Sequence, residues 1–511
     1  MDSFIDMMTA RARRLGVSTV GRQALWRARA ELDGPAIETI RSASLSSYVS
    51  ATSPRAIPEV PCHAPTAPSW VLAPGETVAN RVERALAQVE DQRELNAFTT
   101  VFADRARWEA EELDGSDAQG ESRGPLHGAV LAVKDLMAVR RHRASAGTRA
   151  FAGEPAVKDA VVLQRLTAAG AVLVGATNLH ALAFGPFSTS SDSGVVGNPL
   201  RPGAVAGGSS GGSASAVASG PVDIALGTDT AGSIRIPGAA CGVVGLKGTF
   251  GTAPTDGVYP LGPTLDHVGP MTRSVADAAV AWSVMCGEPV STGVPTSLEG
   301  VVIGDPASFS RAYLDRPVEA ALDSALASAV ELGAQVVQVH APSLHLAPSL
   351  MLCSIGPEAL QVHLDLLRSR ADQLPGDVRL RLEMAMLVSE ADYEQAQRHR
   401  RRLRAELAAV MSAVDVLMLP TLPIATPLTS EINGTTGGGW LIRSAMSRLT
   451  APFNLTGQPA LTLPWGVDPD GGGLGLQIVG AHHREHTVLQ IAAVLEAVQI
   501  ARTRSRRTAG G

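Results

Sequence analysis

The sequence predicts a layered α/β fold with a largely buried β-sheet. Segments with helical periodicity alternate along most of the chain with short apolar segments typical of strands. With 45% hydrophobic and 18% charged residues, the composition is that of a globular protein and not of a disordered one. Such alternation is typical of helices packed on a sheet. At 511 residues the chain is long enough for one large domain or for two or three ordinary ones.

The regular pattern begins near residue 74. Residues 78–90 have the apolar spacing of a helix, and residues 96–103 read as a strand. A strand, a helix and a strand are then predicted at residues 301–306, 318–333 and 334–339. Gly333 stands where a helix C-cap glycine is expected.

The two ends of the chain differ from this central region. Residues 1–50 look helical and rich in Arg and Ala, and a proline-dotted stretch at 53–70 can form neither a long helix nor a central strand. The prediction is an N-terminal helical extension with a Pro-rich linker over residues 1–73 and a single domain over 74–500. Residues 501–511 are predicted to be a disordered basic tail.

The charge pattern argues against several classes of partner. The net charge of −6 is spread thinly, and the basic stretch 398–404 is most simply the solvated face of a helix, so neither nucleic acid nor a membrane surface is expected. The N-terminus lacks the features of a signal peptide, and no apolar run is long enough to span a membrane. The four cysteines are widely separated, which argues against a zinc site or a disulfide framework. We expect a cytoplasmic protein without metal or cofactor.

The stretch from Gly207 to Gly238, GGSSGGSASAVASGPVDIALGTDTAGSIRIPG, is the main functional clue. A flexible spacer is excluded because helix-like and strand-like segments follow the first glycines. The nucleophile elbow of α/β-hydrolases, GxSxG, is matched at Ser209, but the elbow must follow an apolar strand and here follows NPLRPGAVA. The third interpretation takes GGSSGG and TDTAGS together as two turns whose exposed N–H groups form an oxyanion hole beside Ser233.

A nucleophilic serine also needs a base, and the chain has only three lysines. Lys134 ends the apolar run GPLHGAVLAVKDL, where burial would favour the neutral amine, whereas Lys158 and Lys247 are expected by default to be solvated. A pKa lowered from about 10.4 to about 7 or 8 corresponds to roughly 4 kcal/mol, which burial and neighbours can supply.

The residues at this point resemble the amidase signature family of serine hydrolases. The match takes in Gly207 to Pro237 and several further segments, and it covers roughly Pro74 to Ala497. Those segments are GPLHGAVLAVKD, RLTAAGAVLVGATN, LDHVGPMTRSVADAA, DVLMLPTLP and PFNLTGQPALTLP. The resemblance implies a single large domain with a central mixed β-sheet covered by helices on both sides.

The resemblance also implies roles for individual residues. Ser233 would be the nucleophile, Ser209 the bridging serine that follows a cis peptide bond, and Lys134 the base. The backbone N–H groups of residues 230–233 would form the oxyanion hole, contributed by Thr230, Ala231, Gly232 and Ser233.

Other residues of these turns are expected to serve the structure. Asp229 and Arg235 would brace the loop, and Ser210 and Ser213 would bond to the start of a helix. The stretch from Arg140 to Arg143 departs from the small residues common in the family after the lysine, which affects the rim of the site.

The substrate is less well defined. Phe184, Phe187 and Trp440 fall where similar proteins line the acyl pocket, which points to an apolar or aryl amide or a carbamate, but ordinary core packing explains them equally well. Residues 432–440 are rich enough in glycine to act as a lid. A small-molecule substrate, an esterase or urethanase side activity and a homodimer are all compatible with the sequence.

Two alternatives remain. One is a glutamine-hydrolysing subunit of an amidotransferase complex, although the segment like NLARYDG typical of such subunits is replaced at 354–367 by SIGPEALQVHLDLL. The other is an α/β-hydrolase esterase that uses Ser209 with a later acid and histidine. Its candidate partners are Asp266, His267, His482, His483 and His486.

Overall fold

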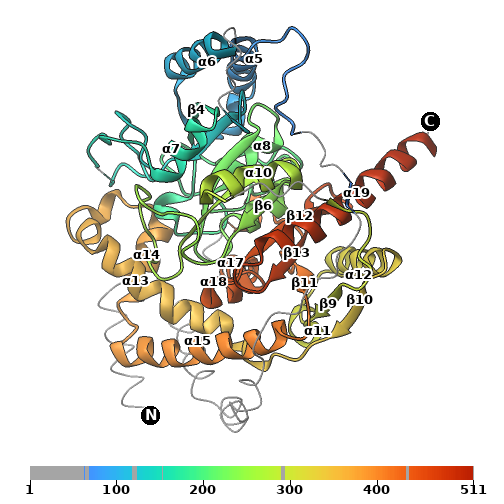
Figure 1. Ribbon diagram of the computed structural model, residues 1–511. Helices are drawn as coiled ribbons and strands as arrows, with labels where there is room; N and C mark the ends of the chain where they lie inside the picture. The colour runs from blue at the N-terminus through green and yellow to red at the C-terminus, as the bar shows by residue number, and fades with distance from the viewer. Residues whose placement is uncertain are drawn as a thin grey trace.

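An eleven-stranded mixed β-sheet forms the centre of the molecule (Figure 1). The computed structural model describes residues 62–63, 68–117, 124–151, 153–288, 294–432 and 437–509. The helical part predicted for the N-terminal extension, residues 1–50, lies outside the described residues. The predicted fold class, a large α/β domain with a mixed sheet between helices, is confirmed.

The sheet is mixed because it contains both parallel and antiparallel strand pairs. Parallel pairs at both ends of the sheet flank a central antiparallel region, and β2 adds an antiparallel edge. From one edge to the other the strands are β10 (Gln335–Gln338), β9 (Val302–Asp305), β11 (Val416–Pro420), β13 (Gly473–Gly480), β12 (Ala460–Val467), β6 (Val244–Lys247), β7 (His267–Thr272), β5 (Ile224–Asp229), β3 (Val130–Lys134), β4 (Val172–Thr177) and β2 (Phe98–Val101). A separate antiparallel pair joins β1 (Cys62–His63) to β8 (Val294–Pro295).

Helices cover both faces of the sheet. On one face of the sheet α7 packs against α10, α10 against α19, and α19 against α12. On the other face α5, α6, α8 and α9 pack over the strands. Figure 1 shows α15 and α13 at the opposite end of the molecule from α5 and α6. The helices are α5 (Val78–Asp91), α6 (Ala103–Asp117), α7 (Val161–Ala168), α8 (Gly211–Ala218), α9 (Arg235–Cys241), α10 (Val275–Cys286), α11 (Ala307–Ser310), α12 (Arg316–Glu331), α13 (Ala347–Arg370), α14 (Gly376–Ala385), α15 (Glu390–Met411), α16 (Thr429–Ile432), α17 (Gly437–Arg448), α18 (Pro452–Thr456) and α19 (Glu485–Ala509). Four short 3₁₀ turns, η1 (Arg93–Leu95), η2 (Ala181–Ala183), η3 (Pro342–Leu346) and η4 (Ala371–Gln373), complete the described elements.

Several elements follow directly from the sequence pattern. The predicted strand, helix and strand near residue 320 are β9, α12 and β10, and Gly333 has a φ of +97° just after α12. A positive φ is the conformation that favours glycine at this position. The predicted tail differs, because the backbone of residues 501–509 continues α19 as a helix.

Alternation along β3 decides which way Lys134 points. Leu131 and Val133 belong to the core beneath α7 and α10, whereas Val130 and Ala132 belong to the core beneath α5, α6 and α8. Successive side chains of a strand point to opposite faces, so Lys134 shares the face of Val130 and Ala132. The sheet therefore directs Lys134 towards the side of α8, which begins next to Ser209 and Ser210.

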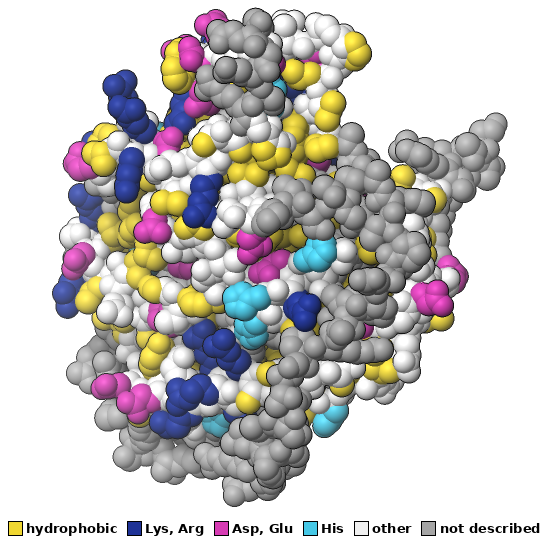
Figure 2. Space-filling model, viewed as in Figure 1, with side chains coloured by type: hydrophobic (Ala, Val, Ile, Leu, Met, Phe, Trp, Pro, Cys, Tyr) yellow, Lys and Arg dark blue, Asp and Glu magenta, His cyan; other side chains and the backbone are white. Residues whose placement is uncertain are grey.

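The surface shows no concentration of one charge on the face seen in Figure 2, where acidic and basic side chains are interspersed among apolar ones. The basic stretch 398–404 lies on α15 with Arg398, Arg401 and Arg404 exposed, as predicted for a solvated helix face. None of the helices in the described ranges is long and apolar enough to cross a membrane.

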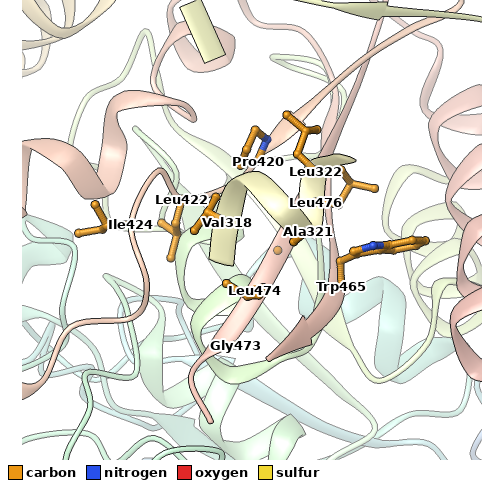
Figure 3. Close-up of a pocket in the computed structure, with 11 residues that line it drawn as sticks. Val318, Ala321, Leu322, Pro420, Leu422, Ile424, Trp465, Gly473, Leu474 and Leu476 are labelled. Atoms are coloured by element: carbon orange, nitrogen blue, oxygen red, sulfur yellow. The ribbon is translucent and has the colours of Figure 1, made fainter. Parts of the chain in front are cut away.

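A small apolar space between α12 and the sheet serves packing and not binding (Figure 3). Its lining includes Val318 and Leu322 of α12, Leu476 of β13 and Trp465 of β12. The volume of about 10 Å³ is about that of one water-sized probe, which is far too small for a substrate.

Candidate active site

Lys134 is fully buried at the end of β3 and contacts two hydroxyl groups. Its Nζ atom lies 2.7 Å from Ser209 Oγ and 2.8 Å from Thr228 Oγ1. Thr228 comes from β5, which is the parallel neighbour of β3, so strand pairing brings the two side chains together. The burial predicted for Lys134 and its contact with Ser209 are confirmed.

Burial changes the protonation of this lysine. Loss of contact with water lowers the pKa of Lys134 from 10.5 to about 7, although the charges of Asp266 and Asp229 act in the opposite direction. At pH 7 the Lys134 amine is therefore uncharged in about half of the protein molecules. A neutral amine 2.7 Å from a hydroxyl group has a lone pair with which it can accept the hydroxyl proton.

Ser209 and Ser233 lie in adjoining backbone segments. The N–H of Ser210, next to Ser209, donates a 3.2 Å hydrogen bond to the carbonyl oxygen of Ser233. The Gly208–Ser209 peptide bond is cis, as the resemblance implies. Ser209 is fully buried and Ser233 is 8% exposed, so the second hydroxyl is the one nearer to solvent.

The roles predicted for Ser210 and Ser213 at a helix start were wrong. Ser210 makes no cap bond to α8, and its Oγ donates to the carbonyl oxygen of Thr228 at 3.1 Å. Ser213 Oγ donates to the carbonyl oxygen of Leu226 at 2.9 Å. Both hydroxyls thus fix α8 to β5, because buried strand carbonyls lie within reach of the helix face that packs on the sheet.

Asp229 shapes the turn that carries Ser233. Its carboxylate accepts hydrogen bonds from the amides of Gly232 at 2.7 Å and Ile234 at 3.2 Å, and from the guanidinium of Arg235 at 2.9 and 3.0 Å. These contacts are those expected of a pair that braces the loop. They also correct the predicted oxyanion hole, since the Gly232 amide already points at Asp229 and is not free for a substrate oxygen.

The ion pair between Asp229 and Arg235 is completely buried. Arg235 also donates to the side-chain oxygens of Gln477 and Asn454, both at 2.6 Å, so its charge is fully solvated by protein groups. The Arg235 guanidinium holds the pKa of Asp229 well below its usual range.

Removing the charge of Asp229 is expected to destabilise the fold. Asp229→Asn leaves the Arg235 charge buried without its partner, which costs about 3–5 kcal/mol in the free energy of unfolding. Urea unfolding would measure this loss. The control is Glu90→Gln, because the ion pair of Glu90 and Arg93 is 72% and 79% exposed and its loss should change stability by less than about 1 kcal/mol. Equal stability of Asp229→Asn and the unaltered protein would contradict the bracing role.

A cavity of about 460 Å³ opens beside Thr228. Most of its lining comes from residues 250–268, including Asp266 and His267. Asp266 accepts a 2.6 Å hydrogen bond from the hydroxyl of Thr230, at the start of the turn that carries Ser233. Burial raises the pKa of Asp266 to about 6. Thr228 and Asp266 were not singled out as partners of Lys134 in the sequence, although Thr228 begins the TDTAGS motif.

The aromatic residues predicted to line an acyl pocket are buried. Phe184 and Phe187 are 3% and 0% exposed, and each ring is covered by the guanidinium of an arginine, from Arg381 and Arg443 respectively. The side chain of Trp440 lies outside the described part of the chain. Of the lid predicted at 432–440, residues 433–436 also lie outside it, whereas the backbone of residues 437–440 forms the start of α17.

The other two lysines differ from each other. Lys158 is exposed, as expected, whereas Lys247 is completely buried and the expectation of a solvated side chain was wrong. Lys247 Nζ donates to the carbonyl oxygens of Gly248 at 3.2 Å and of Gln458, and it lies 3.3 Å from His267 Nε2.

Two of the histidines considered as partners of Ser209, His267 and His482, have other contacts. Both ring nitrogens of His267 are engaged elsewhere, by Lys247 and by the carbonyl oxygen of Leu265, and His482 Nε2 contacts the carbonyl oxygen of Thr456. Across the described ranges, no group of three or more His, Cys, Asp or Glu side chains could hold a metal ion.

Comparison with known proteins identifies the family. The family model Amidase matches residues 80–489. The chain belongs to the amidase family. Members of this family are hydrolases that act on carbon–nitrogen bonds, and the resemblance drawn from the sequence is confirmed.

The relatives of this amidase-family chain include both hydrolase and amidotransferase subunits. It is 37% identical to the 1-carboxybiuret hydrolase subunit AtzE of Pseudomonas sp. (strain ADP), over 84% of this chain and 97% of that protein. It is 35% identical to a glutamyl-tRNA(Gln) amidotransferase subunit of Synechococcus sp. (strain WH7803), over 85% of this chain and 96% of that protein. A crystal structure of an amidase superposes with a TM-score of 0.76 at 35% identity, over 83% of this chain and 96% of that one.

Proposed function

We propose that the protein hydrolyses the C–N bond of a small-molecule amide, anilide or carbamate through an acyl-enzyme on Ser233. One observation carries the proposal. Lys134, buried and with a pKa of about 7, lies 2.7 Å from the hydroxyl of Ser209. A buried amine so placed can act as a base at neutral pH without any histidine.

The proposed first half-reaction is a proton relay with nucleophilic attack. Neutral Lys134 accepts the proton of Ser209, Ser209 accepts that of Ser233, and Ser233 Oγ forms a bond to the carbonyl carbon. When the tetrahedral intermediate collapses, the C–N bond breaks and the leaving nitrogen receives the proton through the same relay. The acyl group remains on Ser233 as an ester.

In the second half-reaction water takes the place of the amine. Water gives a proton to the relay and attacks the ester carbon, the bond to Ser233 Oγ breaks, and Ser233 recovers its proton as the acid product leaves. The amides of Thr230, Ala231 and Ser233 are proposed to stabilise the negative oxygen in both halves. Each such donor contributes about 3–4 kcal/mol to the transition state in comparable enzymes.

The cavity beside Thr228 is large enough for a small substrate. Its volume of about 460 Å³ falls within the range of sites that bind small molecules, roughly 300–1,000 Å³. Phe184, Phe187 and Trp440 remain proposed as residues that line the acyl pocket.

Covalent labelling tests the proposal. A fluorophosphonate is expected to modify Ser233, and peptide mapping by mass spectrometry would locate the adduct. Labelling should increase with pH through about 7, because Lys134 must lose its proton to act as the base. An adduct on Ser209 would instead favour the esterase alternative.

A glutamine-hydrolysing subunit remains a second candidate because one relative is an amidotransferase subunit by name. The segment corresponding to NLARYDG is absent from this chain, as 354–367 reads SIGPEALQVHLDLL, which is why a free-standing hydrolase is preferred. Ammonia release from glutamine only after partner subunits are added would reverse this preference.

A further inference from the structure

Four side chains from three distant parts of the chain form a charged cluster, here called the arginine cluster. It consists of His180, Asp377, Arg381 and Arg443. His180 follows β4, Asp377 and Arg381 lie on α14, and Arg443 lies on α17. Asp377 Oδ2 is 3.1 Å from His180 Nε2 and 3.2 Å from Arg443 Nη2.

The charges in the arginine cluster do not balance. Burial lowers the pKa of His180, so this ring is neutral at pH 7, and burial lowers the pKa of Arg381 only to about 9. Two guanidinium charges therefore face the single carboxylate of Asp377, which leaves one positive charge uncompensated.

Hydrogen bonding in the arginine cluster is also incomplete. Arg381 Nη1, Arg443 Nη1 and His180 Nδ1 are buried atoms without a hydrogen-bond partner among the described residues. A buried polar atom left unpaired is costly, especially on a charged group, and the great majority of such atoms in folded proteins have a partner. Nε2 of neutral His180 donates to Asp377, so His180 Nδ1 is itself an acceptor, whereas the two arginine atoms are donors. Two unpaired donors on neighbouring guanidinium groups indicate that an acceptor is supplied from outside the chain.

The arginine cluster lies next to the proposed reaction centre. The N–H of His180 donates a 3.1 Å hydrogen bond to the carbonyl oxygen of Ser209. The guanidiniums of Arg381 and Arg443 lie 4.1 and 4.9 Å from the ring centres of Phe184 and Phe187, in the segment just after His180. The side chains of Asp377 and Arg443 are 27% and 16% exposed, so solvent reaches part of the cluster.

We propose that Arg381 and Arg443 bind a carboxylate of the substrate. The amide hydrolysed at Ser233 would then carry a carboxylate that a few carbon atoms separate from the scissile C–N bond. Guanidinium groups suit this ligand because their planar, multiple donors match the two oxygens of a carboxylate. This inference rests on the proposed function and names its substrate class.

Matched substrate pairs test the inference. The monoamides of malonic, succinic and glutaric acid each carry a carboxylate, and the corresponding diamides do not. We expect at least one monoamide to be hydrolysed with a kcat/KM about 10-fold or more above that of its diamide, because bonds to a charged group contribute this much. Arg381→Gln should bring this ratio close to one, mainly through KM, and Arg381→Lys should retain part of it.

Arg379→Gln is the matched control, since Arg379 lies on the same helix but is 46% exposed and pairs with Glu383. This variant should keep the preference for the monoamide. Binding of succinate and glutarate to the Ser233→Ala protein, measured by calorimetry, gives a readout that needs no turnover. Arg381→Gln should weaken the binding of both dicarboxylates, and Arg379→Gln should not.

The outcomes separate the two proposals. Hydrolysis of monoamides and diamides at equal rates, with Ser233 labelled, would overturn the carboxylate site and leave the proposed function intact. An unlabelled Ser233 and no hydrolysis of any amide would overturn the proposed function. If Arg381→Gln does not fold, equal kcat/KM values for the paired substrates and no binding of the dicarboxylates still overturn the inference.

Discussion

Ser233→Ala is expected to lower kcat for amide hydrolysis by about 10⁴-fold or more, because the variant has no oxygen on which to form the acyl-enzyme. The fold should persist, since the structural contacts of this residue run through its backbone, as in the bond from the Ser210 amide to the Ser233 carbonyl. Steady-state kinetics on a substrate of the unaltered enzyme, with thermal unfolding in parallel, would measure both properties.

The control for this variant is Ser215→Ala. Ser215 is a buried serine of α8 whose Oγ bonds to the carbonyl oxygen of Gly197, away from Lys134. The Ser215→Ala variant should have a kcat close to that of the unaltered enzyme. If Ser233→Ala retained more than about a tenth of the activity while Ser209→Ala lost all of it, the nucleophile would be Ser209 and the esterase alternative would stand.

The part of the site that depends on local sequence could be predicted. Lys134 stands at the end of an apolar strand, and an apolar strand in an α/β fold is buried on both faces, so the burial of its last residue follows from the pattern. The turn after β5 was recognised for a similar reason. Its Gly, Ser, Asp and Arg residues are close together in the sequence and contact one another, as Asp229 and Arg235 do across six positions.

The contacts that depend on strand order could not be predicted. Lys134 and Thr228 are 94 positions apart and meet only because β3 and β5 are neighbours in the sheet. Lys247 was expected in solvent because lysine usually is, but β6 lies in the middle of the sheet and places it among buried carbonyl oxygens. For the same reason the sequence did not reveal that Ser210 and Ser213 bond to β5 and not to their own helix.

The arginine cluster is the clearest case of this limit. His180 and Asp377 are 197 positions apart, and Arg443 comes from yet another helix. Each of these residues looks like an ordinary surface residue when its own helix or loop is considered alone. Only the packing of α14 and α17 against the segment after β4 shows that their charges share one partly buried site.

Lys134→Met is expected to abolish most of the activity and at the same time to stabilise the fold. Loss of a general base lowers the rate by about 10²- to 10⁴-fold. In the unaltered protein, burial lowers the pKa of Lys134 from 10.5 to about 7, so folding at pH 7 requires the lysine to give up much of its proton affinity. This costs up to roughly 4 kcal/mol, a cost that methionine does not have.

The hydrogen bonds to Ser209 and Thr228 are lost in this variant, which offsets part of the gain. A net increase of about 1–3 kcal/mol in the free energy of unfolding at pH 7 is therefore expected. Lys158→Met, at an exposed position, should change neither activity nor stability appreciably. Urea unfolding of the two variants and the unaltered protein would show the difference.

The pH dependence of this gain distinguishes burial of the amine from other causes. Between pH 7 and 10.5 the unfolded chain binds more protons at Lys134 than the folded protein does, so the unaltered protein becomes more stable as pH rises through this range. The advantage of methionine is then greatest at or below pH 7 and is lost by about pH 10.5. A stability difference that stayed constant with pH would show that Lys134 is charged in the folded protein, and a charged Lys134 could not accept the proton of Ser209.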